Sequence, residues 1–242
     1  MNSKRFRNKI MFKINKKPLI YWILNRISQS RLVDKFVVAT TNRSSDNKFV
    51  NWLKKNTTFE IFRGSNRNVL KRFFFCAKKY KAEYIVRITA DDPLKDYRII
   101  DKAIKIIIKN KKIDYCSNTL LPSYPDGFDV EVFKYSSLKK AYLEAKLDSE
   151  KEHVTPFIWK NKSLFKAVNF KYKQDLSKWR LTVDVKKDIK IIKKIIMHFK
   201  NIIPVPYYKI INYIKNNKKI ELVTKIKKNN SYFEQIKYEK IR

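Results

Sequence analysis

The chain has 242 residues, 44% of them apolar, enough to bury the core of one large domain or two small ones. Lysine and arginine outnumber aspartate and glutamate by 57 to 22. Because lysines occur in nearly every segment rather than in one arginine-rich stripe, this charge predicts salt-screened attraction to polyanions and no specific nucleic-acid site.

Membrane segments, secretion and disulfides are not indicated. The most hydrophobic window, residues 99–108, is broken by charged side chains, so no segment is expected to span a bilayer. Residues 1–13 are basic and lack the apolar stretch of a signal peptide. Cys76 and Cys116 are isolated, with no spacing typical of a metal site or a disulfide framework. We therefore expect a cytoplasmic protein.

Helical and strand patterns alternate along the first half of the chain. In order, the sequence predicts a helix over 18–29, a strand over 35–41, a helix over 46–55, a strand over 60–62, a helix over 69–80, a strand over 83–89, a helix over 97–109 and a strand over 113–117. This alternation is typical of a parallel sheet covered by helices on both faces.

The rhythm changes after Pro122. The later elements are a strand over 130–133, a helix over 136–146, a strand over 164–172, a helix over 186–200 and a short helix over 207–215. No repeat or Gly/Ser-rich linker separates the two halves. We predict one α/β domain over residues 1–222, with a mostly parallel sheet flanked by helices, and a basic tail over residues 223–242.

Two adjacent carboxylates, Asp91 and Asp92, follow the strand predicted over 83–89. Ligands of open parallel sheets bind beyond the carboxyl ends of the strands, and Mg²⁺ prefers carboxylate oxygens while keeping positions for water and substrate phosphates. An aspartate before Pro93 can equally shape a turn and cap the next helix. The motif alone therefore leaves a metal site and a turn as alternatives.

A second acidic site repeats this arrangement. A short apolar segment ends in Asp184, and Asp188 follows in the first turn of a helix. Asp184 could simply cap that helix. If both segment ends lie in one cleft, however, Asp91 and Asp184 could hold one Mg²⁺ between them. The basic residues that could meet a polyphosphate are Lys4, Arg5, Lys9 and Arg63.

The only two glycines of the chain are expected to occupy special backbone geometries. Gly127 follows Pro125 and Asp126, which predicts a tight turn before a strand. Gly64 precedes Ser65, a possible helix cap, and could allow close approach of the backbone to a ligand.

Seven segments occur in a characteristic order and spacing: KPLIYWILNRI, VVATTN, IFRGSNRNVLKRF, YIVRITADDPL, YCSNTLLPSYPDGFDVEVF, SEKEHVTPFI and RLTVDVKKD. Together they resemble the cytidylyltransferase family that includes spore-coat polysaccharide biosynthesis protein F. That family is related to the synthetases that make CMP-activated acylneuraminate and 3-deoxy-manno-octulosonate. The resemblance covers nearly the whole chain, and collinear blocks are more specific than any single motif.

The resemblance implies a Rossmann-like nucleotide-diphosphosugar transferase fold and transfer of CMP from CTP to a sugar hydroxyl, with release of pyrophosphate. Asp91 and Asp184 match the family's Mg²⁺-binding aspartates, and Asp92 matches a variable position. Lys9 matches the lysine that closes the nucleotide loop and Arg5 the arginine of that loop. We also expect Arg63 and Gly64 beside the nucleotide, and the family suggests a homodimer.

The sugar side is expected in two further blocks. Asp129, Glu152 and His153 lie in segments that resemble the family's sugar-binding region. Glu131 alternates with apolar residues and could simply face solvent. For His153, a hydrogen-bonding role within a helix is an equal alternative.

The N-terminus departs from the family pattern. Family members begin with an apolar strand that leads into a loop of the type Arg-Met-Gly-Ser-x-Arg-Leu-Pro-Gly-Lys. This sequence starts at MNSKRFRNK, inside that loop, with Arg7 and Asn8 in place of Pro-Gly. We therefore expect the first strand to be missing, which would leave two neighbouring strands with unpaired edges. Either translation begins upstream, or the chain is an N-terminally truncated, weakly active copy.

Two other classes of function remain open. A metal-dependent glycosyltransferase of the GT-A type could use the same fold and an aspartate pair to hold a nucleotide sugar. Release of pyrophosphate from CTP, as against release of a nucleoside diphosphate from a nucleotide sugar, separates the two enzymes. A non-catalytic or nucleic-acid-binding protein would instead fail to bind CTP. The sequence does not identify the sugar.

Overall fold

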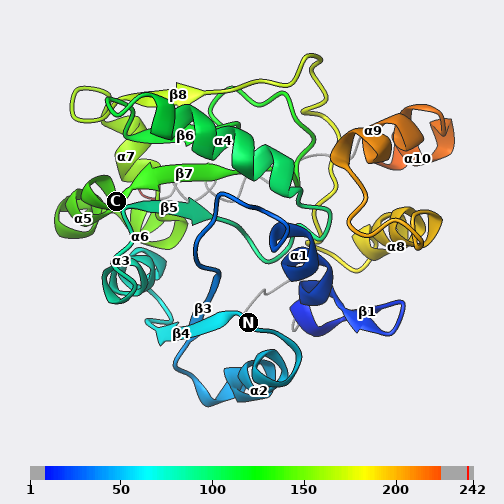
Figure 1. Cartoon of the computed structure of the whole chain (residues 1–242), viewed down its shortest axis with the longest axis horizontal. Coiled ribbons are helices and arrows are strands. Elements are labelled where there is room, and N and C mark those ends of the chain that lie inside the picture. Colours follow the sequence, from blue (N-terminus) through cyan, green and yellow to red (C-terminus); the bar gives the residue numbers. More distant parts are fainter. Residues whose placement is uncertain (1–8, 225–238, 240–242) are drawn as a thin grey trace.

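The chain folds as a mixture of strands and helices, shown in Figure 1. This computed structural model describes residues 9–224 and residue 239. The predicted α/β class is confirmed: helices surround a sheet, with α4 (Tyr97–Lys109) across one side and α3 (Val69–Lys79) and α5 to α7 (residues 135–160) on the other (Figure 1).

The larger sheet has four strands in the order β5-β7-β6-β8. They are β5 (Tyr84–Arg87), β7 (Glu131–Lys134), β6 (Tyr115–Ser117) and β8 (Ala167–Asn169). Strand β7 is antiparallel to β5 and β6, whereas β6 and β8 are parallel. The other three strands of this sheet therefore share one direction, as a mostly parallel sheet requires, and β7 is the reversed strand.

A separate parallel pair is formed by β3 (Val37–Thr41) and β4 (Glu60–Gly64). Among the described residues, β3 pairs only with β4, and β5 pairs only with β7. The expectation that a first strand is missing concerns the N-terminus, which lies outside the described residues, and it stays a prediction. A short hairpin of β1 (Lys13–Ile14) and β2 (Lys17–Pro18) precedes β3 and β4. Its turn has positive φ at both central positions, the geometry of the favoured two-residue hairpin turn.

The helices follow the predicted order, with ends shifted by a few residues. They are α1 (Leu19–Ile27), α2 (Asn47–Asn56), α3 (Val69–Lys79), α4 (Tyr97–Lys109), α5 (Tyr135–Glu144), α6 (Asp148–His153), α7 (Pro156–Lys160), α8 (Asp188–His198), α9 (Tyr207–Lys215) and α10 (Lys218–Thr224), with two single-turn 3₁₀ helices, η1 (Lys9–Met11) and η2 (Ser44–Asp46). Helices α6, α7 and α10 were not predicted. The strand predicted over 164–172 shortens to β8.

Helix α4 shows why the local predictions succeeded. Its side chains at residues 99, 100, 103, 104 and 107 are buried, which is the spacing of one helix face. The Asp96 carboxylate caps its first turn by accepting a hydrogen bond from the Arg98 backbone N–H. The buried face packs against β6 and β7.

Two apolar clusters lie on opposite faces of the large sheet. Cys116 and Val132 belong to the larger cluster, whereas their strand neighbours Tyr115 and Phe133 belong to the smaller one. Successive side chains of a strand point to opposite faces. Helices α3, α5 and α7 contribute to the smaller cluster. Both faces of the sheet are therefore covered, and this is why the Glu131 side chain on β7 is buried.

The C-terminal end of the domain extends past the predicted limit at residue 222. Helix α10 continues to Thr224, which is buried and accepts a hydrogen bond from the Arg180 backbone N–H at 2.9 Å. Glu239 accepts hydrogen bonds from the backbone N–H and the hydroxyl of Ser149, at 2.6 and 2.5 Å. The remaining residues of the predicted basic tail lie outside the described residues.

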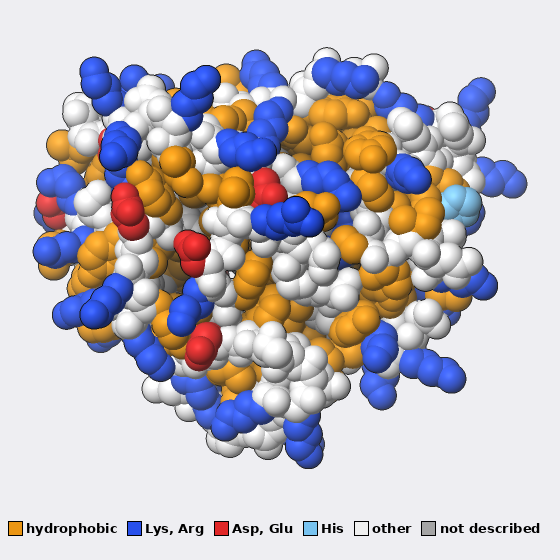
Figure 2. Space-filling view, viewed as in Figure 1, with side chains coloured by type: hydrophobic (Ala, Val, Ile, Leu, Met, Phe, Trp, Pro, Cys, Tyr) orange, Lys and Arg blue, Asp and Glu red, His pale blue; other side chains and the backbone are white. Residues whose placement is uncertain are grey.

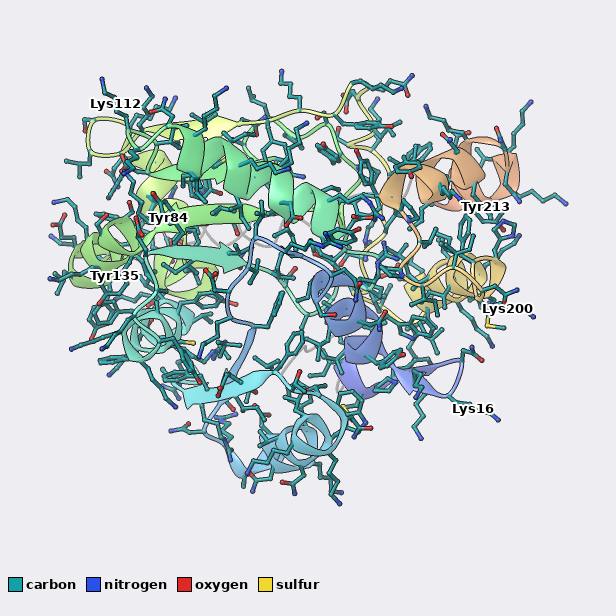
Figure 3. All side chains as sticks on the ribbon, in the orientation of Figure 1. Lys16, Tyr84, Lys112, Tyr135, Lys200 and Tyr213 are labelled. Carbon is teal, nitrogen blue, oxygen red and sulfur yellow. The ribbon has the colours of Figure 1, made fainter. Side chains whose placement is uncertain are left out.

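Charge on the surface is dispersed, as the sequence predicted. Figure 2 shows lysine and arginine side chains over the whole visible face, interspersed with apolar and uncharged groups. Figure 3 shows one of them, Lys16, at the tip of the β1–β2 hairpin at the edge of the molecule. Within residues 9–224 and 239, no helix combines the length and apolar character needed to cross a membrane.

Candidate active site

Asp91 lies in the turn that follows β5. Its backbone carbonyl accepts hydrogen bonds from the Val183 N–H, at 2.8 Å, and from the Thr182 hydroxyl, at 3.3 Å. The apolar segment that ends in Asp184 is therefore bonded directly to the Asp91 turn. This segment is not a strand: its only ladder contact among the described residues is an isolated parallel bridge between Asp126 and Arg180.

Lys9 joins the two aspartates. Its ammonium nitrogen lies 2.9 Å from Asp91 Oδ2 and 3.2 Å from Asp184 Oδ1, and it also donates to the Val183 carbonyl at 2.9 Å. These residues are separated by 82 and 175 positions along the chain. The hypothesis that the two acidic segments meet is thus confirmed in geometry, whereas metal binding by them stays a prediction.

The cluster is partly buried and strongly charged. The Lys9, Asp91 and Asp184 side chains are 14%, 28% and 16% exposed. Burial opposes ionisation of Asp91, but the charge of Lys9 and hydrogen bonds from Lys9 and Thr89 outweigh it and hold the Asp91 pKa below its usual value. Asp91 is therefore a carboxylate at neutral pH, available to a cation.

Asp188 fixes the position of Asp184. The Asp188 carboxylate accepts hydrogen bonds from the Asp184 and Val185 backbone N–H groups, at 2.8 and 2.9 Å, and pairs with Arg180 at 2.7 Å. The capping role considered for Asp184 is not found: the N-cap position of α8 is Lys187, and no side chain caps the helix there. The Asp184 side chain is free to turn towards Lys9, with Arg180 3.4 Å from its other oxygen.

Asp92 has a different role from its neighbour. It is buried and accepts hydrogen bonds from the Thr89 hydroxyl, at 2.7 Å, and the Lys95 ammonium, at 2.8 Å. Lys95 is fully buried and also donates to the Asp129 carbonyl. Asp92 does shape the turn, as predicted, through an ion pair that the sequence analysis missed. The signal was the three-residue spacing of Asp92 and Lys95 in DDPLK.

Arg63 and Gly64, which were also predicted to lie beside the nucleotide, make contacts that explain a structural role. Arg63 donates to the Thr41 and Arg43 carbonyls and to the Asn47 side chain, so its guanidinium ties β4 to the loop after β3. Gly64 is required by packing: a β-carbon there would lie 2.9 Å from the Phe62 ring and 3.1 Å from Arg72 Cγ. Arg5 and Lys4 lie outside the described residues.

Gly127 has the structural role that was predicted for it. Its φ of +109° is strained for any other residue, and a β-carbon would lie 2.9 Å from the Leu181 backbone carbon. The turn that it forms is bonded to the segment leading to Asp184, since Asp126 accepts from the Leu181 N–H at 2.8 Å. Gly127 therefore allows two loops of the site to pack together.

The predicted sugar-side residues do not form one cluster with the aspartates. Asp129 is half-buried, and its carbonyl is held by Lys95 beside the Asp92 turn. Glu152 is exposed on α6, and His153 is the half-buried last residue of that helix. Through Lys95, Asp129 is linked to the turn that carries Asp91 and Asp92.

Glu131 is buried and does not face solvent, which was the alternative considered for it. Its side chain pairs with Arg87 and accepts hydrogen bonds from the Tyr115 hydroxyl, at 2.7 Å, and the Thr155 hydroxyl, at 2.5 Å. Alternation along β7 does turn Glu131 away from Val132, but that second face is covered by helices.

Known proteins match the chain over most of its length. The sequence model of a family described as cytidylyltransferase matches residues 1–241. Spore coat polysaccharide biosynthesis protein SpsF of Bacillus subtilis is 28% identical over 201 residues, covering 80% of this chain and 81% of its own. An uncharacterized protein of Methanocaldococcus jannaschii, MJ1063, is 36% identical over 236 residues, covering 96% and 94% of the two chains.

Solved structures agree with this assignment. A cytidylyltransferase from Leptospira borgpetersenii superposes with a TM-score of 0.86 at 30% identity, over 93% of this chain and 94% of that one. The CMP:2-keto-3-deoxy-manno-octonic acid synthetase, solved with CTP, shares the fold with a TM-score of 0.61 at 13% identity, over 81% and 95% of the chains. With the sequence match spanning nearly every residue, the chain belongs to the cytidylyltransferase family.

Proposed function

We propose that the protein transfers CMP from CTP to a hydroxyl of a sugar and releases pyrophosphate. The observation that carries this proposal is the convergence of Lys9, Asp91 and Asp184 from three distant segments in a chain of the cytidylyltransferase family. Two carboxylates and an ammonium in one place suit a substrate that carries phosphates and a divalent cation.

The residues present fit Mg²⁺. The Lys9 ammonium is surrounded by three oxygens, from Asp91, Asp184 and the Val183 carbonyl, so this site already holds a cation among hard oxygen ligands. Within residues 9–224 and 239, no group of three or more His, Cys, Asp or Glu gathers around a possible metal position. Two carboxylates that leave positions for water and phosphate are the usual donor set for Mg²⁺.

Asp91 and Asp184 would hold the ion. When bound, Mg²⁺ would supply positive charge to the phosphate oxygens and orient the reacting oxygen.

The side chains of the site have separate tasks in the reaction. The sugar hydroxyl releases its proton to water as its oxygen forms a bond to the α-phosphorus of CTP, while the bond from that phosphorus to the pyrophosphate oxygen breaks. Negative charge accumulates on the phosphates as this happens, and the Lys9 ammonium stabilises it. Asp188 and Asp92, through their backbone and ion-pair contacts, keep Asp184 and Asp91 in fixed positions.

We further propose that the acceptor is an acidic sugar of surface polysaccharide synthesis. Two resemblances support this: SpsF by sequence, and the octonic acid synthetase by fold. Asp129 is the best-placed candidate for a sugar contact, because Lys95 holds its backbone against the Asp92 turn. Glu152 and His153 on α6 remain candidates whose substitution should change the KM for the sugar rather than for CTP.

The decisive experiment measures pyrophosphate release from CTP with Mg²⁺ and a panel of 2-keto sugar acids and neutral sugars. We expect turnover with at least one sugar acid, and a loss of about 10³-fold or more in Asp91→Asn, because the site loses a charged ligand. Asp34→Asn, which removes an exposed carboxylate, is the matched control and should leave turnover unchanged.

Two results would contradict the proposal. Full turnover in Asp91→Asn would remove Asp91 from the site. Release of a nucleoside diphosphate from a nucleotide sugar, without pyrophosphate release from CTP, would assign the same aspartate pair to a glycosyltransferase instead.

A further inference from the structure

We propose that Lys9 occupies the cation position of the Asp91–Asp184 pair in the free protein and must leave it when a divalent metal enters, so that metal and nucleotide bind as a coupled pair. The inference rests on the proposed function, because it takes CTP as the anion that receives the displaced lysine. It adds an order to the assembly of the site.

The first step of the argument is the saturation of Lys9. An ammonium group has three N–H donors, and the Lys9 ammonium has three acceptors: Asp91 Oδ2 at 2.9 Å, the Val183 carbonyl at 2.9 Å and Asp184 Oδ1 at 3.2 Å. Both carboxylates therefore direct an oxygen at the same point. In the free protein the attraction of the two aspartates for a cation is already satisfied.

The second step is the incompatibility of two cations. Mg²⁺ binds oxygens at about 2.0–2.1 Å, and the same two carboxylate oxygens lie 2.9 and 3.2 Å from the Lys9 nitrogen. An ion bound to both oxygens would lie within a few ångströms of the ammonium, where like charges in a partly buried site repel strongly. The lysine and the metal therefore compete for one position.

The third step is the destination of the lysine. Lys9 lies at the start of η1, and its ammonium is on a flexible four-carbon chain that can swing away without moving the backbone. Leaving the aspartates costs three charge-assisted hydrogen bonds, which a triphosphate can replace. Arg180 stays on the outer oxygen of Asp184 and on Asp188, so the aspartates keep their orientation after the exchange.

A coupling of this kind is reciprocal: CTP must raise the affinity for the metal by the factor by which the metal raises the affinity for CTP. Mn²⁺, which can be followed by its electron paramagnetic resonance signal, is the probe. We expect wild-type protein without nucleotide to bind Mn²⁺ weakly, and Lys9→Met to bind it about 10-fold more tightly or better, because the competing cation is gone.

The matched control is Lys16→Met, which removes one positive charge from the exposed tip of the β1–β2 hairpin (Figure 3). It should bind Mn²⁺ as the wild type does. Adding Asp91→Asn to Lys9→Met should abolish the gain, which would locate the tighter ion at the aspartates. Equal Mn²⁺ affinity of the wild type, Lys9→Met and Lys16→Met would overturn the inference.

A second measurement uses only the wild type, in case Lys9→Met does not fold. Mn²⁺ affinity is compared without and with saturating CTP, and the inference requires it to rise at least about 5-fold with CTP. An unchanged affinity overturns it. CTP binding by the wild type with Mg²⁺ is measured separately: its absence would refute the proposed function, whereas CTP binding with no change of metal affinity in Lys9→Met would refute the displacement alone.

Discussion

Two carboxylate clusters of this protein, built from similar residue types, are held in opposite ways. Glu131 and Arg87 face each other in the register of β5 and β7, and the hydroxyls of Tyr115 and Thr155 complete the cluster. Asp91, Asp184 and Lys9 instead come from a turn, a loop and a 3₁₀ turn, and none of the three belongs to a strand.

The two clusters differ in how firmly their cationic side chains, Arg87 and Lys9, are held in place. Arg87, whose side chain is 18% exposed, is held by a sheet partner, and although burial works against its charge, Glu131 raises the Arg87 pKa above the usual value. Burial and the nearby Glu131 charge also raise the Tyr115 pKa, so the phenol stays protonated at neutral pH. Lys9 is a flexible side chain shared between two carboxylates. The first cluster is suited to stabilising the fold and the second to exchanging its cation.

The largest effect on stability is expected when the cluster of Glu131 and Arg87 is broken. Glu131→Ala leaves the part-buried Arg87 guanidinium and two hydroxyls without their acceptor, so we expect the free energy of unfolding to fall by about 3–5 kcal/mol. Urea denaturation followed by tryptophan fluorescence measures it. Glu144→Ala, which breaks the exposed pair with Lys140, should cost less than about 1 kcal/mol. Equal losses in the two variants would show that the Glu131 cluster does not support the fold.

The buried Asp92–Lys95 pair combines features of both clusters. It is fixed, like the Glu131–Arg87 cluster, but it lies beside the cluster of Lys9, Asp91 and Asp184. Lys95→Met would leave Asp92 as an uncompensated buried carboxylate, and we expect a loss of about 3 kcal/mol. Replacing both partners, as Asp92→Leu with Lys95→Met, should recover part of this stability. Denaturation midpoints of the single and double variants show whether stability is recovered. A double variant less stable than Lys95→Met would contradict the ion-pair explanation.

Gly127→Ala tests whether the packing of two loops positions the cluster of Lys9, Asp91 and Asp184. The positive φ and the contact with the Leu181 backbone predict a loss of about 1–3 kcal/mol. Because the displaced segment carries Asp184, pyrophosphate release should fall as well, even at a temperature where the variant is folded. Circular dichroism and the release assay measure the two effects, and normal turnover in a destabilised variant would separate Gly127 from the site.

The smallest effect is expected at Arg63. Arg63→Gln removes hydrogen bonds between β4 and the loop after β3, which should cost about 1 kcal/mol of stability. If Arg63 acts only there, the Kd for CTP should change by less than about 2-fold. Calorimetric titration with CTP measures it. A much weaker affinity would show that the guanidinium leaves these carbonyls to bind the nucleotide, as the sequence first suggested.

Much of the fold was predictable because its signals are local. The helix over 97–109 matches α4 at both ends, since an apolar stripe at helical spacing follows an aspartate cap. The strand over 164–172 was overestimated, because only residues 167–169 find a partner in β6. Hydrophobic residues show that a segment is buried, whereas strand length depends on the neighbour that pairs with it.

Some residues of the candidate site were also predictable from the sequence, and others were not. Asp91 and Lys9 were identified from motifs that resemble a known family, and Gly127 from its turn residues. Lys95 was missed, because a fully buried lysine contradicts the ordinary behaviour of this residue type, and only the Asp92 carboxylate and the Asp129 carbonyl explain it. The burial of Glu131 was not predicted, because alternation gives the direction of a side chain but not what covers that face.

By itself the sequence determined the order of most strands and helices, the turn at Gly127 and the acidic residues that end two apolar segments, because periodicity and turn chemistry act between near neighbours in the chain. Only the tertiary structure decided that Asp91 and Asp184 share one ammonium, that Asp92 is buried with Lys95 and that Glu131 stabilises the sheet. Those contacts join residues 3 to 175 positions apart. Apart from the spacing of Asp92 and Lys95, no local pattern encodes them, because their partners are set by how the sheet and loops pack.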